Sequence, residues 1–123
     1  MLLRGKVAVI HGGAGAIGSA VARAFAYEGA RVFLAGRTRA NLDRVAGQIA
    51  AAGGKVEAAE VDALDERAVD AHADAVAADA GGIDIALNAI GVVHVQGVAF
   101  ADLSLHDFEH PVGVYTRSNF LTA

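Results

Sequence analysis

Residues 7–18 read V-A-V-I-H-G-G-A-G-A-I-G, an apolar run followed by a glycine-rich turn and the start of a stretch with helical spacing. Gly13, Gly15 and Gly18 fit the pattern G-x-G-x-x-G. In that pattern the glycines permit a tight turn, close approach of phosphates to the backbone, and close packing of helix on strand. The start of the helix adds unpaired N–H groups and partial positive charge. The stretch therefore predicts a pyrophosphate-binding turn. A chain with 15 glycines also produces this spacing by chance, so the prediction needs support from other residues of the chain.

The composition is typical of one folded domain. The chain has 123 residues, of which 54% are hydrophobic and 20% charged, with one proline. Its net charge of −4 argues against a nucleic-acid or anionic-membrane surface, which needs a basic face. The lack of cysteine excludes disulfides and thiolate metal sites, and no apolar run approaches the roughly 20 residues of a membrane span. We therefore expect a cytoplasmic protein with neither nucleic acid nor membrane as a partner.

Short apolar runs alternate with helical patterns along most of the chain. The four runs cover residues 7–10, 32–35, 56–61 and 83–87. This β-α-β-α-β-α-β alternation predicts a parallel sheet with helices on its faces. The run at 56–61 contains two glutamates and suits an edge, whereas the other runs are almost wholly apolar and suit the interior. The predicted fold class is α/β, a Rossmann-type doubly wound sheet with strand order 3-2-1-4.

The last third of the chain departs from this alternation. Residues 92–103 have the composition of a loop, and a helical pattern runs from about Leu105 to Ala123, with an interruption expected near Pro111. No helix stop signal precedes the last residue. We expect residues 1–123 to form one NAD(P)-binding domain, the first half of an apparently truncated doubly wound fold.

The residues after the second strand indicate the type of dinucleotide. A dinucleotide fold reads the adenosine ribose about 20 residues beyond the glycines, with an acid for a free 2′-hydroxyl or an arginine for a 2′-phosphate. Here this place reads Arg37-Thr38-Arg39, and no carboxylate occurs before Asp43. Arg37 can stack on the adenine while its edge meets the phosphate, whereas Arg39 is more simply a solvated arginine. NADP(H) is therefore the preferred cofactor, and NAD(H) is possible.

Taken together, these residues resemble the short-chain dehydrogenase/reductase family. The family's phosphate-binding pattern T-G-x-x-x-G-x-G falls on residues 11–18, with His11 in place of the threonine and Ala16 in place of the middle glycine. Asp62 matches the family's acidic residue after the third strand, which binds adenine. The family's N-N-A-G becomes Asn-Ala-Ile-Gly at residues 88–91. The resemblance covers residues 5–123 but only the first half of the family's fold.

The resemblance implies a set of cofactor-binding residues. Asn88 is expected mainly to brace the sheet, because a buried amide must first satisfy its protein neighbours, while residues 89–91 line the cofactor's ribose. The complete expected set is Gly12, Gly13, Ala14, Gly15, Ala16, Ile17, Gly18, Arg37, Thr38, Asp62, Ala63, Asn88, Ala89, Ile90 and Gly91.

The family's catalytic residues have no clear counterpart. The resemblance implies a serine and a tyrosine four residues before a lysine, but Tyr27 is followed at that place by Arg31 and Tyr115 by Asn119. The family's helix V-N-x-x-x-x-F, aligned on Phe120, places Tyr115 where the active-site asparagine stands. Asn119 lies one helical turn later on the same face and is the remaining catalytic candidate.

The sequence thus predicts the cofactor-binding half of an NADP(H)-dependent oxidoreductase that transfers hydride between the nicotinamide and a carbonyl or alcohol. Its small-molecule substrate cannot be read, and the missing catalytic residues indicate a piece of a longer enzyme. One alternative is a non-catalytic dinucleotide-binding or sensing module. Another is an epimerase or dehydratase that holds NAD tightly, against which Arg37 argues. The resemblance also implies a homo-oligomer, dimer or tetramer, formed through the helix that begins near Asp107.

Histidines provide two further signals. His106 and His110 fit the zinc pattern H-x-x-E-H, but Pro111 follows and no further ligand is evident, so we expect a solvated polar segment and no metal site. His11 meets the predicted phosphate turn, where it either adds charge when protonated or simply replaces a hydroxyl in the packing of the turn.

Overall fold

The computed structural model describes residues 1–123. The elements in chain order are β1 (Val7–His11), α1 (Ala16–Tyr27), β2 (Arg31–Gly36), α2 (Arg39–Ala51), β3 (Lys55–Glu60), α3 (Glu66–Ala80), β4 (Ile85–Asn88), a 3-10 turn (Phe100–Asp102) and α4 (Leu105–Thr122). The strands form one parallel sheet in the order β3-β2-β1-β4. This arrangement confirms the predicted fold class and strand order.

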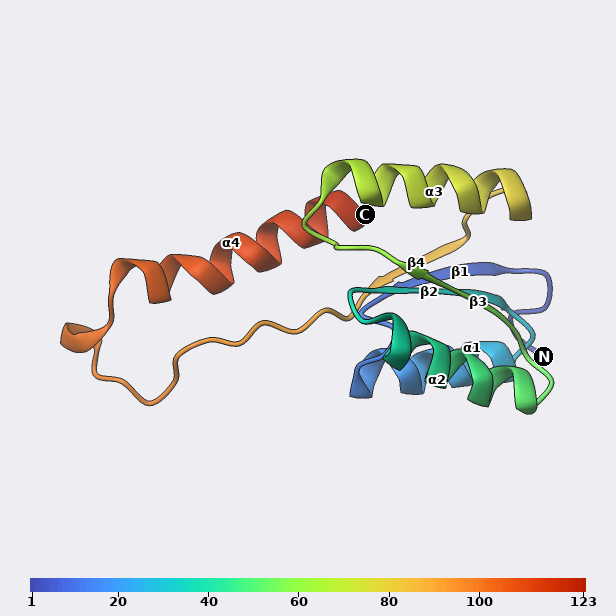
Figure 1. Cartoon of the computed structure of the whole chain (residues 1–123), viewed down its shortest axis with the longest axis horizontal. Helices are drawn as coiled ribbons and strands as arrows, with labels where there is room; N and C mark the ends of the chain where they lie inside the picture. Colours follow the sequence, from blue (N-terminus) through green and yellow to red (C-terminus); the bar gives the residue numbers. More distant parts are fainter.

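The helices cover both faces of the sheet. Figure 1 shows α1 and α2 on one face, with α3 and the end of α4 on the other. Side chains alternate along a strand, so that Ile10 of β1 packs in the core under α1 and α2, whereas Val9 packs with Val76 of α3. The larger cluster includes Leu34, Leu42 and other fully buried side chains. Each large aliphatic side chain buried in this way stabilises the fold by about 1.5–3 kcal/mol.

The position of each strand explains its burial. All residues of β1 are buried because it lies in the interior of the sheet, between β2 and β4. The β3 strand forms an edge, and its residues Lys55, Glu57 and Glu60 are exposed. The edge position predicted from the two glutamates is therefore confirmed. The interior position expected for the fourth apolar run is wrong, because β4 pairs only with β1 and forms the other edge of this sheet, and none of its residues is fully buried.

The fourth helix differs from the prediction. The expected interruption near Pro111 is wrong, because α4 runs continuously from Leu105 to Thr122 with Pro111 inside it. Proline lacks an N–H but its φ suits a helix, and Pro111 stands in the second turn, where solvent can satisfy the one carbonyl that loses its partner. The helix begins after Ser104, whose hydroxyl accepts a hydrogen bond from the Asp107 N–H at 3.1 Å.

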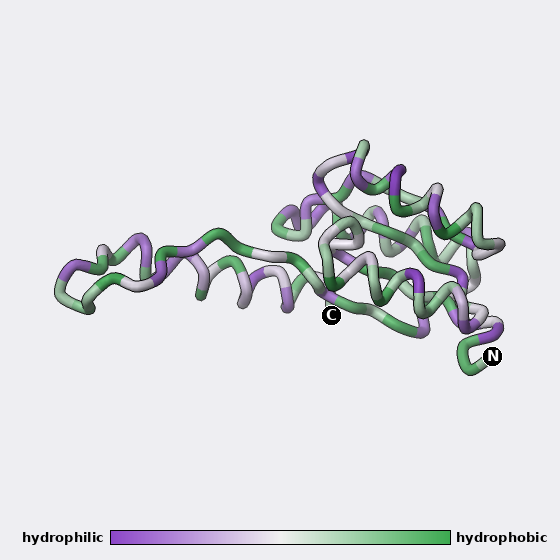
Figure 2. Tube along the Cα trace, turned by 90° about the horizontal axis from the view of Figure 1, so that it is seen from below, coloured by the Kyte–Doolittle hydropathy of each residue, from purple (hydrophilic) through white to green (hydrophobic).

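The first half of α4 and the segment before it form an arm that projects from the sheet (Figure 1). Figure 2 shows hydrophobic residues along this arm as well as in the body of the domain. Exposed fractions are large for several apolar side chains of α4, namely Leu105 at 72%, Phe108 at 56%, Val112 at 56% and Phe120 at 81%. The arm, and α4 near its end at Phe120, thus present apolar surface that the rest of the chain leaves uncovered.

Candidate functional site

A cavity of about 370 Å³ lies at the carboxyl ends of the strands. The strand order reverses between β1 and β4, which is where ligands bind in doubly wound sheets. Four parts of the chain form the walls of the cavity: the turn after β1, the end of β2, the loop after β3, and the segment after β4 together with α4. The lining residues are His11, Gly12, Gly36, Arg37, Val61, Asp62, Ala63, Leu64, Ile90, Gly91, Val92, Val93, His110 and Val114.

The glycine turn is confined by its own neighbours. Gly12 has a φ of +74°, and a Cβ there would lie 2.6 Å from the carbonyl carbon of Ala89. A Cβ on Gly18 would collide with the carbonyl oxygen of Gly12, so α1 can pack against the turn only if residue 18 is glycine. The Gly12 N–H donates to the carbonyl of Ala35 at 2.9 Å, which fixes the turn on the end of β2. The turn is therefore rigid before any ligand arrives.

The start of α1 presents unpaired donors. Its N-cap, Gly15, provides no side-chain cap, and the first N–H to bond back is that of Ser19, which donates to the Gly15 carbonyl at 2.9 Å. The preceding N–H groups of residues 16–18 make no backbone hydrogen bond, nor does that of Ala14. Ala16, which replaces the family's middle glycine, is exposed and leaves these donors accessible. Such donors at a helix N-terminus suit a pyrophosphate.

Two neighbouring arginines have different surroundings. Arg37 is exposed, lines the cavity, and makes no ion pair or hydrogen bond with the protein. Arg39 is occupied, because its Nε pairs with Asp43 at 3.0 Å and its Nη1 donates to the carbonyl of Ala58 at 3.0 Å. Thr38 is the N-cap of α2 and does not line the cavity. Only Arg37 of these residues offers a free cation to a ligand.

The loop after β3 provides a carboxylate. Asp62 and Ala63 both line the cavity. Oδ1 of Asp62 accepts a hydrogen bond from the Leu64 N–H at 3.0 Å, which orients the side chain. Ala63 is buried.

Asn88 connects β4 to α4. Its Nδ2 donates to the Ser118 hydroxyl at 3.1 Å and to Oδ1 of Asn119 at 2.9 Å, and its own Oδ1 accepts from the Ile90 N–H at 3.1 Å. The amide is thus occupied by protein, which fits the bracing role expected for it. Ala89 does not line the cavity, whereas Ile90 and Gly91 do. Asn119 also stands outside the lining, and its catalytic role stays a prediction.

His11 is held neutral by its surroundings. Its side chain is 4% exposed, and its Nδ1 is buried without a hydrogen-bond partner. Burial, with a smaller contribution from His72, lowers the pKa of His11 from 6.5 to about 4. The rings of His11 and His72 meet edge to face with centroids 6.2 Å apart. Burial lowers the pKa of His72 as well. Of the two interpretations of His11 from the sequence, the structure favours a neutral packing role.

The other histidines lie on α4. The rings of His106 and His110 stack with centroids 5.5 Å apart, as expected for residues four apart on a helix. No group of three or more potential metal ligands occurs in the structure. Sequence reasoning missed that His110 and Val114 line the cavity. Their spacing of four places them on one helix face, but nothing in the sequence indicates that this face meets the cavity.

A family model described as short chain dehydrogenase matches residues 6–123, nearly all of the chain. The chain belongs to the short-chain dehydrogenase family. Among curated relatives, D-threitol dehydrogenase of Mycolicibacterium smegmatis is 35% identical over 119 residues, which are 97% of this chain and 45% of that protein. The chain therefore spans about half the length of such relatives.

Solved structures of the family have the same fold. The short-chain dehydrogenase/reductase from Serratia marcescens has a TM-score of 0.87 and 32% identity, over 99% of this chain and 49% of that one. A metagenomic short-chain oxidoreductase in complex with NADP has a TM-score of 0.85 and 31% identity, over 99% of this chain and 55% of that one. Separately, none of the helices combines the length and the apolar character needed to cross a membrane.

Proposed function

We propose that residues 1–123 bind NADP(H) for an oxidoreductase that transfers hydride between the nicotinamide and a carbonyl or alcohol. The observation that carries the proposal is the cavity itself, which brings Gly12 of the glycine turn, the unpaired Arg37, Asp62 and Gly91 to one edge of the sheet. A second support is the related metagenomic oxidoreductase whose structure is in complex with NADP. A cytoplasmic location belongs to the same proposal.

The cavity and the start of α1 would bind different parts of the cofactor. The N–H groups at the start of α1 do not line the cavity, but they would donate hydrogen bonds to the pyrophosphate without rearrangement, because they have no protein partners. Asp62, fixed by the Leu64 N–H, would accept a hydrogen bond from the adenine amino group. Residues 90 and 91, positioned by Asn88, would line the ribose. The bound cofactor would supply the hydride.

Arg37 is the basis for choosing NADP(H) over NAD(H). A guanidinium that is free of protein carboxylates can form charge-assisted hydrogen bonds with a 2′-phosphate. Arg39 is less suited to this purpose in the structure, since it pairs with Asp43 and donates to the carbonyl of Ala58. NAD(H), which lacks the 2′-phosphate, would leave Arg37 without an anionic partner.

The proposal assigns cofactor binding, and not the chemical step, to these residues. No tyrosine of the chain precedes a lysine by four positions. A non-catalytic dinucleotide-binding module is therefore the alternative function, and it would show saturable NADPH binding without turnover in the longest natural form of the protein.

Titration with NADPH and with NADH, monitored by nicotinamide fluorescence, tests the choice of cofactor. We expect Arg37→Gln to weaken NADPH binding about tenfold or more, as for loss of a charge-assisted contact, and to leave NADH binding within about twofold. Arg39→Gln is the matched control and should leave the ratio of the two affinities unchanged. Equal effects of the two substitutions on NADPH would refute the role of Arg37, and no saturable binding by the wild type would refute the proposed function.

We also propose that the protein self-associates through α4. The supporting observation is the run of exposed apolar side chains on this helix, including Leu105, Phe108 and Val112. Sedimentation at several concentrations tests it, with Phe108→Asp as the variant expected to shift the protein to smaller species. An unchanged distribution for that variant would place the contact elsewhere.

A further inference from the structure

The position of α4 decides whether the cavity is closed on its outer side. The sheet ends and the loop after β3 form one part of the lining, and α4 contributes the opposite part through His110 and Val114. This lining depends on where the helix is held, because the first half of α4 projects beyond the sheet (Figure 1). A small rotation of the arm would move both side chains away from the cavity.

Only the second half of α4 is fastened to the domain. The Asn88 amide binds Ser118 and Asn119 and fixes the helix to β4. Ser118 is fully buried, and Leu121 packs against the small cluster that includes Val61. The contacts of Asn88 hold the end of the helix to β4, whereas Leu121 packs against a cluster formed by residues of β2, the loop after β3 and α3.

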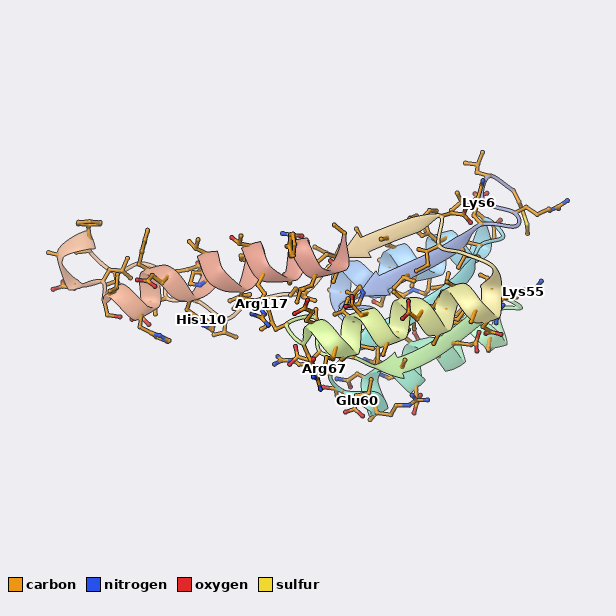
Figure 3. The ribbon with its side chains drawn as sticks, turned by 90° about the horizontal axis from the view of Figure 1, so that it is seen from above. Lys6, Lys55, Glu60, Arg67, His110 and Arg117 are labelled. Atoms are coloured by element: carbon orange, nitrogen blue, oxygen red, sulfur yellow. The ribbon has the colours of Figure 1, made fainter.

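Arg117 supplies the hydrogen bond that connects α4 to a wall of the cavity. Its Nε donates to the carbonyl of Leu64 at 2.8 Å, so that α4 is joined to the loop after β3. Leu64 itself lines the cavity, and its N–H binds the carboxylate of Asp62. His110, Val114 and Arg117 are spaced by four and three residues and so share one helix face. Figure 3 shows Arg117 and His110 leaving α4 on the same side, with Arg117 toward the start of α3.

We propose that Arg117 is a positioning residue for the adenosine half of the ligand. Its hydrogen bond to Leu64 sets the distance between α4 and the loop that carries Asp62, and it thereby fixes the width of the cavity. The glycine turn lies outside this connection, since it is anchored to Ala35 and Ala89 on the sheet. Loss of the Arg117 contact should therefore weaken binding of the adenosine half and spare binding of the pyrophosphate.

This inference rests on the proposed dinucleotide function, so its test compares a ligand that contains the adenosine half with one that lacks it. The probes are 2′,5′-ADP, which contains the adenosine with its 2′- and 5′-phosphates, and inorganic pyrophosphate, which has no adenosine. Calorimetric titration of the whole chain compares wild type with Arg117→Met, which keeps the aliphatic stem and removes the donor. The matched control is Arg67→Met, which removes an exposed cation from the nearby start of α3, where the structure records no contact to the cavity.

We expect Arg117→Met to weaken 2′,5′-ADP about five- to tenfold, as for loss of one hydrogen bond from a charged donor, and to change pyrophosphate affinity less than about twofold. Arg67→Met should change both affinities by less than about twofold. Equal losses of 2′,5′-ADP affinity in Arg117→Met and Arg67→Met would mean that Arg117 acts only by its charge and would overturn the inference. Equal weakening of both probes by Arg117→Met would mean a general structural role and would overturn it too.

Failure of the proposed function has a different result. If the wild-type chain binds neither 2′,5′-ADP nor NADPH, the dinucleotide function fails and the role of Arg117 fails with it. If the wild type binds 2′,5′-ADP and Arg117→Met binds it equally well, the inference alone is overturned.

Discussion

His11 should make the stability of this domain depend on pH between about 7 and 4. Its pKa is lowered from 6.5 to about 4 in the folded protein, so the unfolded chain binds the proton more readily as the pH falls. The stability is therefore complete above the unfolded pKa and declines until the pH reaches the folded pKa. The full loss is about 3 kcal/mol, and near pH 5 it is already about 2 kcal/mol.

Urea unfolding of wild type and His11→Thr, each near pH 7.5 and near pH 5, measures this effect. Threonine cannot titrate, so the free energy of unfolding of the variant should fall by about 2 kcal/mol less than that of the wild type between these two pH values. The other titratable groups are present in both proteins, so the comparison isolates the contribution of His11 together with its contact to His72. His106→Gln removes an exposed imidazole from the arm, and it should show the same change in the free energy of unfolding between the two pH values as the wild type. An equal loss in wild type and His11→Thr would show that His11 takes up its proton without cost in the fold, and it would refute the argument from burial.

Two further substitutions test the turn and the brace by urea unfolding. Gly12→Ala should destabilise the domain by about 2 kcal/mol or more, because the residue has positive φ and its methyl would press on the Ala89 carbonyl. Gly47→Ala, in an exposed and open part of α2, should instead stabilise it by about 0.5–1 kcal/mol, and destabilisation at both sites would argue against the described turn. Asn88→Ala removes the contacts to Ser118, Asn119 and Ile90 and should cost about 2–3 kcal/mol, with faster amide exchange in α4. Unchanged exchange in α4 would show that the helix is held by other contacts.

Much of the fold could be predicted because its signals are local. The apolar strands, the charged edge run and the helical spacing each follow from residues close together in the chain, and the right-handed crossover rule leaves few ways to connect them. The glycine turn is similar. Glycine is needed at positions 12 and 18 because backbone atoms a few residues away, or just after the adjacent strand β4, leave no room for a side chain. The error at Pro111 is also local, because a proline near the start of a helix has a weaker effect than one in its centre.

The site was harder to predict because it depends on side chains brought together from distant elements. The sequence favours Arg37 over Arg39 as the ligand by its position, but the contacts that occupy Arg39, with Asp43 and with the carbonyl of Ala58, are visible only in the structure. The neutral state of His11 follows from its burial beside His72, a residue 61 positions later in the chain (72 minus 11).

The sequence by itself determined the parallel sheet, its strand order and the glycine turn after β1, because periodicity and glycine placement act over short stretches of chain. Only the tertiary structure decided how α4 closes the cavity. That position is set by hydrogen bonds of Asn88 to residues 30 and 31 positions away and of Arg117 to a carbonyl 53 positions away. Such contacts form only when the packed sheet has brought the elements together, and no local pattern encodes them.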